Sequence, residues 1–227
     1  FEKGKADVRF TARSNGGHAS APPKNSPVAR LAAFVDSMEK HPPFRKKFEP
    51  EVSAMFARLA AYAPFALRLL FGNLWLFAPL MKLVMPALSP QAGAMLRTTA
   101  AFTMLSGSDA CNVLPQEASV WANLRFIPHQ GMDESLALIK KRAEKYGIET
   151  EVLSASDYSA PADIHGEAWR RVTDTIAEVF PGLAWSPYVM TGATDAKNYQ
   201  AICDNCIRFA PVIYGPEQMR GMHGVNE

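Results

Sequence analysis

The sequence contains few cysteines. The three that occur among its 227 residues, Cys111, Cys203 and Cys206, are a small and odd set, which excludes a disulfide-rich scaffold. Cys203 and Cys206 have the spacing of a zinc knuckle or a redox motif. A structural zinc needs a second pair of soft ligands, however, and only the distant Cys111 remains. We therefore expect the cysteines to be chemically inert.

A strong charge of either sign is also missing. The chain has 24 Lys and Arg against 22 Asp and Glu, a net charge of +2, and no basic run. Nucleic-acid binding demands a concentrated basic face, so this composition excludes that class of function. Hydrophobic residues make up 48% of the chain, which is enough to bury a globular core.

The first residues show neither an initiator Met nor the basic and apolar regions of a signal peptide. We expect the chain to be the distal part of a longer protein. The compartment of that protein is then unknown, because a missing signal in this part does not reveal it. The cytoplasm is our starting expectation.

No uncharged apolar run reaches the ~18–20 residues that cross a bilayer. The longest candidate lies between Arg68 and Lys82, and Pro79 interrupts it. We expect residues 48–96 to form short helices that pack on a core or on a partner. Peripheral contact with a membrane stays open, because apolar helical surface of this size can also dock on lipid.

The remaining periodicity predicts alternating strands and helices. Pro27 and a capping Ser26 begin an apolar helical pattern, and Pro42 ends it. A second helix is expected over 133–146, and strands are expected at 6–13, 98–106, 117–127 and 148–153. The order β-α-(helical insertion)-β-β-α-β predicts an α+β, ferredoxin-like sandwich, in which two helices cover an antiparallel sheet.

We expect this ferredoxin-like domain to span residues 5–155, with the helical insertion at about 48–96. The small residues and Pro161 that follow favour a boundary there. Residues 156–227 would belong to a second domain. In that part the pattern predicts a helix over 165–180 and a short strand over 184–190.

Two histidines lie in glycine-loosened loops. His18 belongs to the run Gly-Gly-His-Ala-Ser and His223 to Met-His-Gly, where an imidazole can meet a substrate or a metal. Neither has enough ligands nearby in sequence to form a metal site alone, and a structural role is the alternative for both. The other three histidines adjoin prolines or polar segments, where we expect solvent exposure: His41, His129 and His165.

Small residues over 191–197 stand between the expected strand and a helix start. Backbone N–H groups there, with Thr194 and Lys197, could cradle an anion. The alternative is a capped helix start, where Thr194 or Asp195 accepts from free backbone donors. Judged alone, the capped helix start is favoured over the anion site.

Asn112 precedes one strand and Arg125 lies inside it. Both could reach the same ligand, with the Arg guanidinium gripping a carboxylate through two parallel hydrogen bonds. The alternative is a turn-forming Asn and a surface Arg on an amphipathic strand. Each residue judged singly favours that alternative.

Taken together, these motifs resemble one family over essentially the whole chain. The sequence is similar to the aminoacylase/carboxypeptidase family of two-zinc metallopeptidases, whose members include carboxypeptidase G, succinyl-diaminopimelate desuccinylase and aminoacylase. The apolar insertion resembles most the branch of Gly-X carboxypeptidases and N-acyl-amino-acid hydrolases. The motifs occur in the family's order: residues 16–22 around His18, 112–115, Arg125, 192–197, 208–211 and 222–224.

The resemblance implies a ferredoxin-like lid inserted into an α/β zinc-binding domain, with lids pairing into a homodimer. His18 would stabilise the oxyanion, often in the partner's active site. Asn112 and Arg125 would bind the substrate's carboxylate or backbone, with Thr194 assisting. His223 would be the terminal ligand of one of two zinc ions, for which cobalt or manganese is possible. The expected activity is hydrolysis of an amide bond next to a free carboxylate, in a small peptide or an N-acyl amino acid.

The family's other metal ligands and its catalytic Glu pair lie before the lid, so we expect this chain alone to be inactive. Ala193 and Lys197 are mild departures from the family pattern. The apolar insertion could bind a fatty-acyl portion or enlarge the lid interface. A non-catalytic dimerisation module, or a substrate-capturing module built on the lid, is the alternative function.

Overall fold

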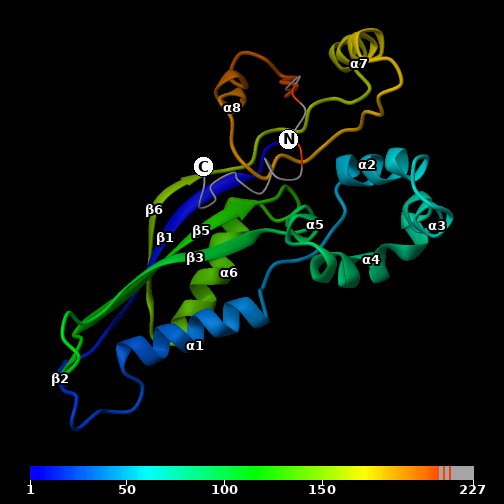
Figure 1. Ribbon diagram of the computed structural model, residues 1–227. Coiled ribbons are helices and arrows are strands. Elements are labelled where there is room, and N and C mark those ends of the chain that lie inside the picture. The colour runs from blue at the N-terminus through cyan, green and yellow to red at the C-terminus, as the bar shows by residue number, and fades with distance from the viewer. Residues whose placement is uncertain (210–211, 213–214, 216–227) are drawn as a thin grey trace.

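The computed structural model describes residues 1–209, 212 and 215 (Figure 1). Its centre is a four-stranded antiparallel sheet in the order β3-β5-β1-β6. The strands are β1 (Gly4–Arg13), β3 (Thr99–Ser106), β5 (Glu117–Phe126) and β6 (Glu149–Ser156). This order confirms the predicted α+β, ferredoxin-like class, because the last strand pairs beside the first.

Two helices cover one face of the sheet, α1 (Pro27–Lys40) and α6 (Met132–Glu144). Helix α1 begins as the sequence predicts, since the Ser26 hydroxyl accepts from the Ala29 N–H at 3.4 Å. Strand β1 alternates, so Val8 and Phe10 point into the core. Phe34 of α1 packs on Phe10 with ring centroids 4.9 Å apart. The opposite face of the sheet carries polar side chains.

The apolar segment forms four helices, α2 (Pro50–Ala60), α3 (Phe65–Gly72), α4 (Leu74–Leu88) and α5 (Pro90–Ala94). They form a second apolar core with Phe1, Ile127 and Val189. Lys3 ties this core to the sheet, because its buried ammonium donates to the carbonyls of Ala94 at 3.0 Å and Arg97 at 2.7 Å. The insertion therefore packs at the end of the sheet where β1 begins (Figure 1).

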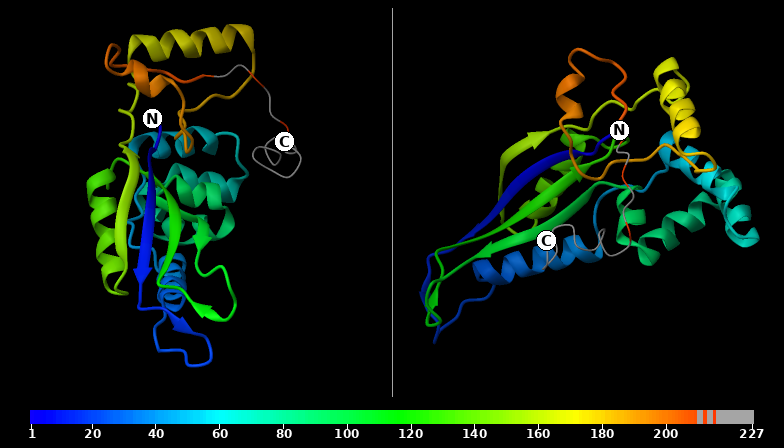
Figure 2. Two further views of the ribbon diagram at one scale, coloured as in Figure 1. Left: turned by 90° about the vertical axis from the view of Figure 1, so that its left-hand side faces the viewer. Right: turned by 45° about the horizontal axis from the view of Figure 1, so that its top comes forward.

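A small ribbon, β2 (Gly17–His18) with β4 (Val113–Leu114), lies at the opposite end of the sheet (Figures 1 and 2). The sequence analysis did not predict it. Gly16 permits the turn, because its φ is +69° and a Cβ there would stand 2.9 Å from Gln116 Cγ. The ribbon is the tip of the molecule.

The rest of the described chain lies beyond the start of β1. Helix α7 (Glu167–Val179) agrees with the prediction over 165–180. The strand predicted over 184–190 is wrong, because only Met190 bridges to another residue, Glu2. Its β-branched and aromatic residues fit a strand, but a ladder needs a partner along its whole length. Helix α8 (Ala196–Tyr199) is a single turn.

Within the described residues, no single helix combines the length and apolar composition that a bilayer crossing requires. The pair α3 and α4 meets the criterion together, by length and composition only, and bends by 108° at the break between them.

Candidate functional site

His18 lies exposed at the tip of the ribbon. The Ser20 N–H donates to its Nδ1 at 3.2 Å, and the Ser20 hydroxyl lies 2.8 Å from the same nitrogen. Because Nδ1 accepts from Ser20, the proton of the neutral ring is on Nε2. The imidazole thus presents one N–H donor that has no partner among the described residues.

Asn112 lies next to His18. Its backbone carbonyl accepts from the Ala19 N–H at 3.0 Å, which joins the two loops beside the β2–β4 pairing. Within the described residues the amide side chain of Asn112 is exposed and has no hydrogen bond. The ribbon therefore brings together two residues that are 94 positions apart in sequence, and both offer polar groups to an incoming ligand.

Arg125 lies on β5, on the open face of the sheet, opposite Lys5 of β1. Its Nε donates to Asn123 Oδ1 at 2.9 Å, and Asn123 Nδ2 donates to Asp7 at 2.6 Å. In the described part of the chain no partner is recorded for the two terminal nitrogens of Arg125. The Nε bond to Asn123 thus orients the guanidinium, and its two terminal NH2 groups are available to a ligand.

The neighbourhood of Arg125 is positively charged. Burial and, to a smaller extent, the positive charges of Arg125 and Arg97 together lower the pKa of Lys3 to about 7. Burial also lowers the pKa of Arg97, against a smaller opposite effect of Glu39. Arg125 and Arg97 both lie close enough to Lys3 to lower its pKa, and neither forms an ion pair with a carboxylate of the described residues, so this region attracts anions.

Arg125 and the tip lie at opposite ends of the sheet. Arg125 pairs with Lys5 in β1, whereas the tip begins beyond Arg13. Eight residues of strand at about 3.3 Å each separate these positions by roughly 26 Å. The expectation that Asn112 and Arg125 reach one ligand is therefore not met within a single chain.

Thr194 lies near the start of β1, at the same end of the sheet as Arg125. Its hydroxyl donates to the buried Glu2 carboxylate and accepts from the Ala196 N–H, two residues further on, at 3.3 Å. Arg208 Nε donates to the same Glu2 oxygen at 2.6 Å. Burial opposes ionisation of Glu2, but the bonds from Thr194 and Arg208 outweigh it and hold the Glu2 pKa below its usual value.

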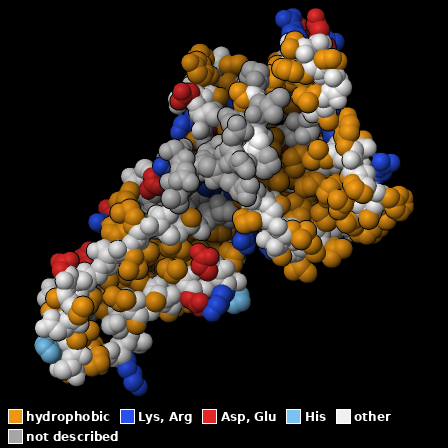
Figure 3. All heavy atoms as spheres, in the orientation of Figure 1, with side chains coloured by type: hydrophobic (Ala, Val, Ile, Leu, Met, Phe, Trp, Pro, Cys, Tyr) orange, Lys and Arg blue, Asp and Glu red, His pale blue; other side chains and the backbone are white. Residues whose placement is uncertain are grey.

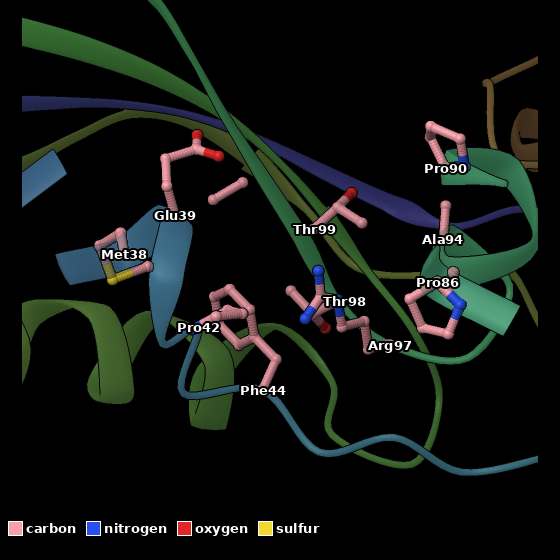
Figure 4. Close-up of a pocket in the computed structure, with 12 residues that line it drawn as sticks. Met38, Glu39, Pro42, Phe44, Pro86, Pro90, Ala94, Arg97, Thr98 and Thr99 are labelled. Carbon is pink, nitrogen blue, oxygen red and sulfur yellow. The ribbon is translucent and has the colours of Figure 1, made fainter. Parts of the chain in front are cut away.

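Two clefts flank this end of the molecule. The larger, about 690 Å³, is mainly apolar and lies between α7 and residues 183–190 and 206–209, with Thr194 and Arg208 on its wall. The smaller, about 270 Å³, lies between the end of α1 and the α4–α5 segment. Figure 4 shows Arg97 between Glu39 on one side and Pro86 on the other. His18, Asn112 and Arg125 line neither cleft.

The expectation that His129 is solvent-exposed is wrong, whereas His41 and His165 are exposed as predicted. The side chain of His129 is only 3% exposed. Its Nδ1 lies 2.6 Å from Glu49 Oε1, and its Nε2 lies 3.0 Å from the Arg45 carbonyl. Burial raises the Glu49 pKa, but bonding and charge from His129 outweigh that effect and lower it. The contact between Glu49 and His129 joins the start of α2 to the turn that follows β5.

No metal centre is assembled by the described residues, which hold no group of three His, Cys, Asp or Glu able to bind an ion. His223, the predicted zinc ligand, lies outside the described residues. Cys111, Cys203 and Cys206 are free thiols.

The comparisons with known proteins agree with this fold. A family model described as a peptidase dimerisation domain matches residues 2–151. The chain belongs to this family. The match spans both covering helices, the helical insertion and the sheet up to the start of β6, so the apolar α2–α5 segment is part of a peptidase dimerisation domain.

Relatives of the domain include hydrolases. The chain is 31% identical over 229 residues to a human N-fatty-acyl-amino acid synthase/hydrolase, covering all of this chain and 45% of the relative. It is 28% identical over 227 residues to a probable carboxypeptidase S-like protein of Dictyostelium discoideum, covering all of this chain and 43% of the relative. The chain thus spans less than half the length of these relatives.

A solved structure has a similar fold. An amidase of the hydantoinase/carbamoylase family from Burkholderia phymatum superposes with a TM-score of 0.50 at 12% identity, over 88% of this chain and 40% of that one. This likeness concerns the fold alone.

Proposed function

We propose that this chain is the lid and C-terminal part of a metal-dependent amidohydrolase. The enzyme would cleave an amide bond next to a free carboxylate, in a small peptide or an N-acyl amino acid. The relatives named as carboxypeptidase and N-fatty-acyl-amino acid hydrolase support this class of reaction. The observation that carries the proposal is the guanidinium fork of Arg125, which has no partner among the described residues and lies near Arg97 at one end of the open sheet face.

Arg125 would bind the carboxylate of the substrate. Its Nε bond to Asn123 fixes the plane of the guanidinium, and the two terminal nitrogens can then donate in parallel to two carboxylate oxygens. The positive charge of Arg97 adds favourable potential at this end of the sheet. Thr194 would assist there.

His18 would stabilise the oxyanion that forms when the amide carbonyl is attacked. A neutral imidazole with its proton on Nε2 is a suitable donor, because an oxyanion needs an N–H directed at it. Asn112 beside it offers a second donor through its free amide. Both residues stand on a ribbon held by strand pairing, which keeps them positioned.

His18 would act in the site of a second copy. Along the sheet, roughly 26 Å of strand, at about 3.3 Å per residue, separate Arg125 from the start of the tip. One short substrate cannot bridge that distance. A homodimer formed through the lid would let the tip of one protomer reach the Arg125 end of its partner.

His223 would be a ligand of one of two zinc ions, with cobalt or manganese as alternatives; this remains a prediction from the resemblance. The described residues do not themselves form a site that fits a metal ion, so their proposed roles are binding and orientation. We accordingly expect the 227-residue chain alone to be inactive.

The first test uses Arg125→Gln in the longer enzyme that the proposal requires. Loss of a two-pronged charged contact should lower kcat/KM for an N-acyl amino acid by about 100-fold. With the methyl ester of the same substrate, variant and wild type should be nearly equal. Arg9→Gln is the matched control, because Arg9 lies on the same face and bonds to Glu151. An equal loss on the ester would contradict the role of Arg125.

The second test uses the N-acyl amino acid and mixes two strongly impaired variants, His18→Ala and Arg125→Gln, so that their subunits exchange. If His18 acts across the dimer, each mixed dimer regains one complete site, about a quarter of wild-type sites in an equal mixture. If His18 acts within its own chain, the mixture stays strongly impaired. A stable dimer without hydrolysis of any acyl-amino acid would instead favour the dimerisation module.

A further inference from the structure

Helix α4 is apolar on the side that faces away from the protein. Trp75, Leu76, Leu80 and Leu83 follow one another at helical spacing along that side and are all exposed, Trp75 to 81% and Leu83 to 71%. Pro79 and Ala87 complete the stripe. Figure 3 shows hydrophobic side chains gathered over this lobe.

The inner side of α4 already has its own partners. Met81 and Met85 are buried in the second core, and Leu74 and Phe77 pack against it. Core packing therefore accounts for one face of the helix and leaves the other unexplained. A helix that is apolar all round is typical of a deep core or of a lipid environment. A deep core does not suit a helix with an exposed face, so this face would be covered by lipid or by a partner.

The charges of this segment are all of one sign. Residues 52–96 contain Arg58, Arg68 and Lys82 and no Asp or Glu. Arg68 lies on α3 beside the strongly exposed Phe65, and Lys82 lies at the edge of the α4 stripe. Cationic side chains beside an exposed apolar stripe complement anionic lipid headgroups. A protein partner would instead be expected to meet a polar rim of mixed hydrogen-bonding groups.

The geometry favours a position in the interface over a crossing. Helix α4 has 15 residues, so at about 1.5 Å per residue it is roughly 22 Å long, shorter than the ~30 Å hydrocarbon core. The 108° bend prevents α3 from extending it as one straight span. Exposed Trp75 and Tyr62 are the aromatic types that gather where a bilayer meets water.

We propose that the outward side of α3 and α4, the α3–α4 surface, docks on an anionic lipid bilayer. The stripe Trp75, Leu76, Leu80 and Leu83 enters the headgroup–acyl boundary, and Arg68 and Lys82 meet lipid phosphates. The inference rests on the insertion alone and does not depend on the hydrolytic function.

The test is co-sedimentation of the 227-residue chain with vesicles of phosphatidylcholine, alone or mixed with phosphatidylglycerol. We expect binding to the anionic vesicles to exceed binding to neutral ones by about tenfold or more, and to weaken in high salt. Brominated lipids should quench the fluorescence of the wild type and quench Trp75→Phe much less.

Leu83→Glu should lower vesicle binding by about tenfold or more, because it places a carboxylate in the stripe. Val179→Glu is the matched control, since Val179 is also exposed on a helix, α7, and its variant should bind as the wild type does. Circular dichroism checks folding, and Leu83→Ala should give an intermediate loss even if the charged variant unfolds.

Other results would overturn the proposal. These are no binding to either vesicle, equal binding by Leu83→Glu, or quenching that does not depend on Trp75. A dimer that Leu83→Glu splits in sedimentation velocity, without vesicle binding by the wild type, would assign the α3–α4 surface to a second copy of the chain.

Discussion

Helices α1 and α4 have similar lengths and similarly apolar inner faces, yet they differ in the large side chains and charges of their outer faces. Helix α1 buries Leu31, Phe34 and Met38, and its outward side carries charged residues such as Asp36 and Lys40. Helix α4 buries two methionines and turns a tryptophan and several leucines outward. Helical periodicity thus identifies which residues can be buried, but the environment of each face decides which of them stabilise the fold.

The largest effect should come from replacing the same kind of side chain on the two helices. Phe34→Ala removes a fully buried ring that packs on Phe10 and whose centroid lies 5.7 Å from the ring centroid of Phe102. We expect it to lower the free energy of unfolding by about 3–5 kcal/mol. Leu83→Ala, on the outward side of α4, should change it by no more than about 0.5 kcal/mol.

Urea denaturation of both variants at pH 7 measures the contrast. Similar losses from the two substitutions would mean that the α4 stripe is buried in solution, as in a stable dimer.

The strands and the two long helices of the sandwich followed from local patterns. Alternation in β1 and β5 reflects a sheet with one buried face, and Ser26 with Pro27 marks the start of α1 through capping chemistry. These features depend on residues close together in sequence, which is why the predicted order of elements was sufficient to give the fold.

The long-range features could not be predicted in the same way. Burial of His129 depends on Glu49, 80 positions earlier, and no spacing rule connects them. The ribbon that joins His18 to Asn112 is only two residues per strand, too short for a periodic signal. The segment over 184–190 had strand-like residues, but its environment supplies a partner to Met190 only.

A second contrast concerns two carboxylates, one bonded to a buried histidine and one in an exposed ion pair. Glu49→Gln should lower the free energy of unfolding by about 3 kcal/mol at pH 7, because it leaves His129 buried without its carboxylate. Asp36→Asn, which breaks the exposed pair with Lys40, should cost less than about 0.5 kcal/mol.

The direction in which the stabilisation by Glu49 changes with pH follows from the lowered pKa of its carboxyl group. Its contribution is complete above the ordinary carboxyl pKa of 4.5 and is lost as the pH falls through the lower folded value. The difference between wild type and Glu49→Gln should therefore shrink below pH 4.5. A difference that stays constant down to pH 3 would assign the stabilisation to packing.

The smallest expected effect is a pH dependence of stability that comes from Lys3, before the start of β1, and not from a lysine near the tip. The folded pKa of Lys3 is about 7, below its ordinary value of 10.5. Between these values the unfolded chain binds a proton that the folded chain lacks, so stability rises with pH. From pH 7 to pH 9 the rise should be about 2 kcal/mol.

Lys3→Met should remove this rise, whereas Lys24→Met, in an exposed loop near the tip, should keep it. Urea midpoints at several pH values measure both variants. A rise that persists in Lys3→Met would mean that another group near the second core titrates instead.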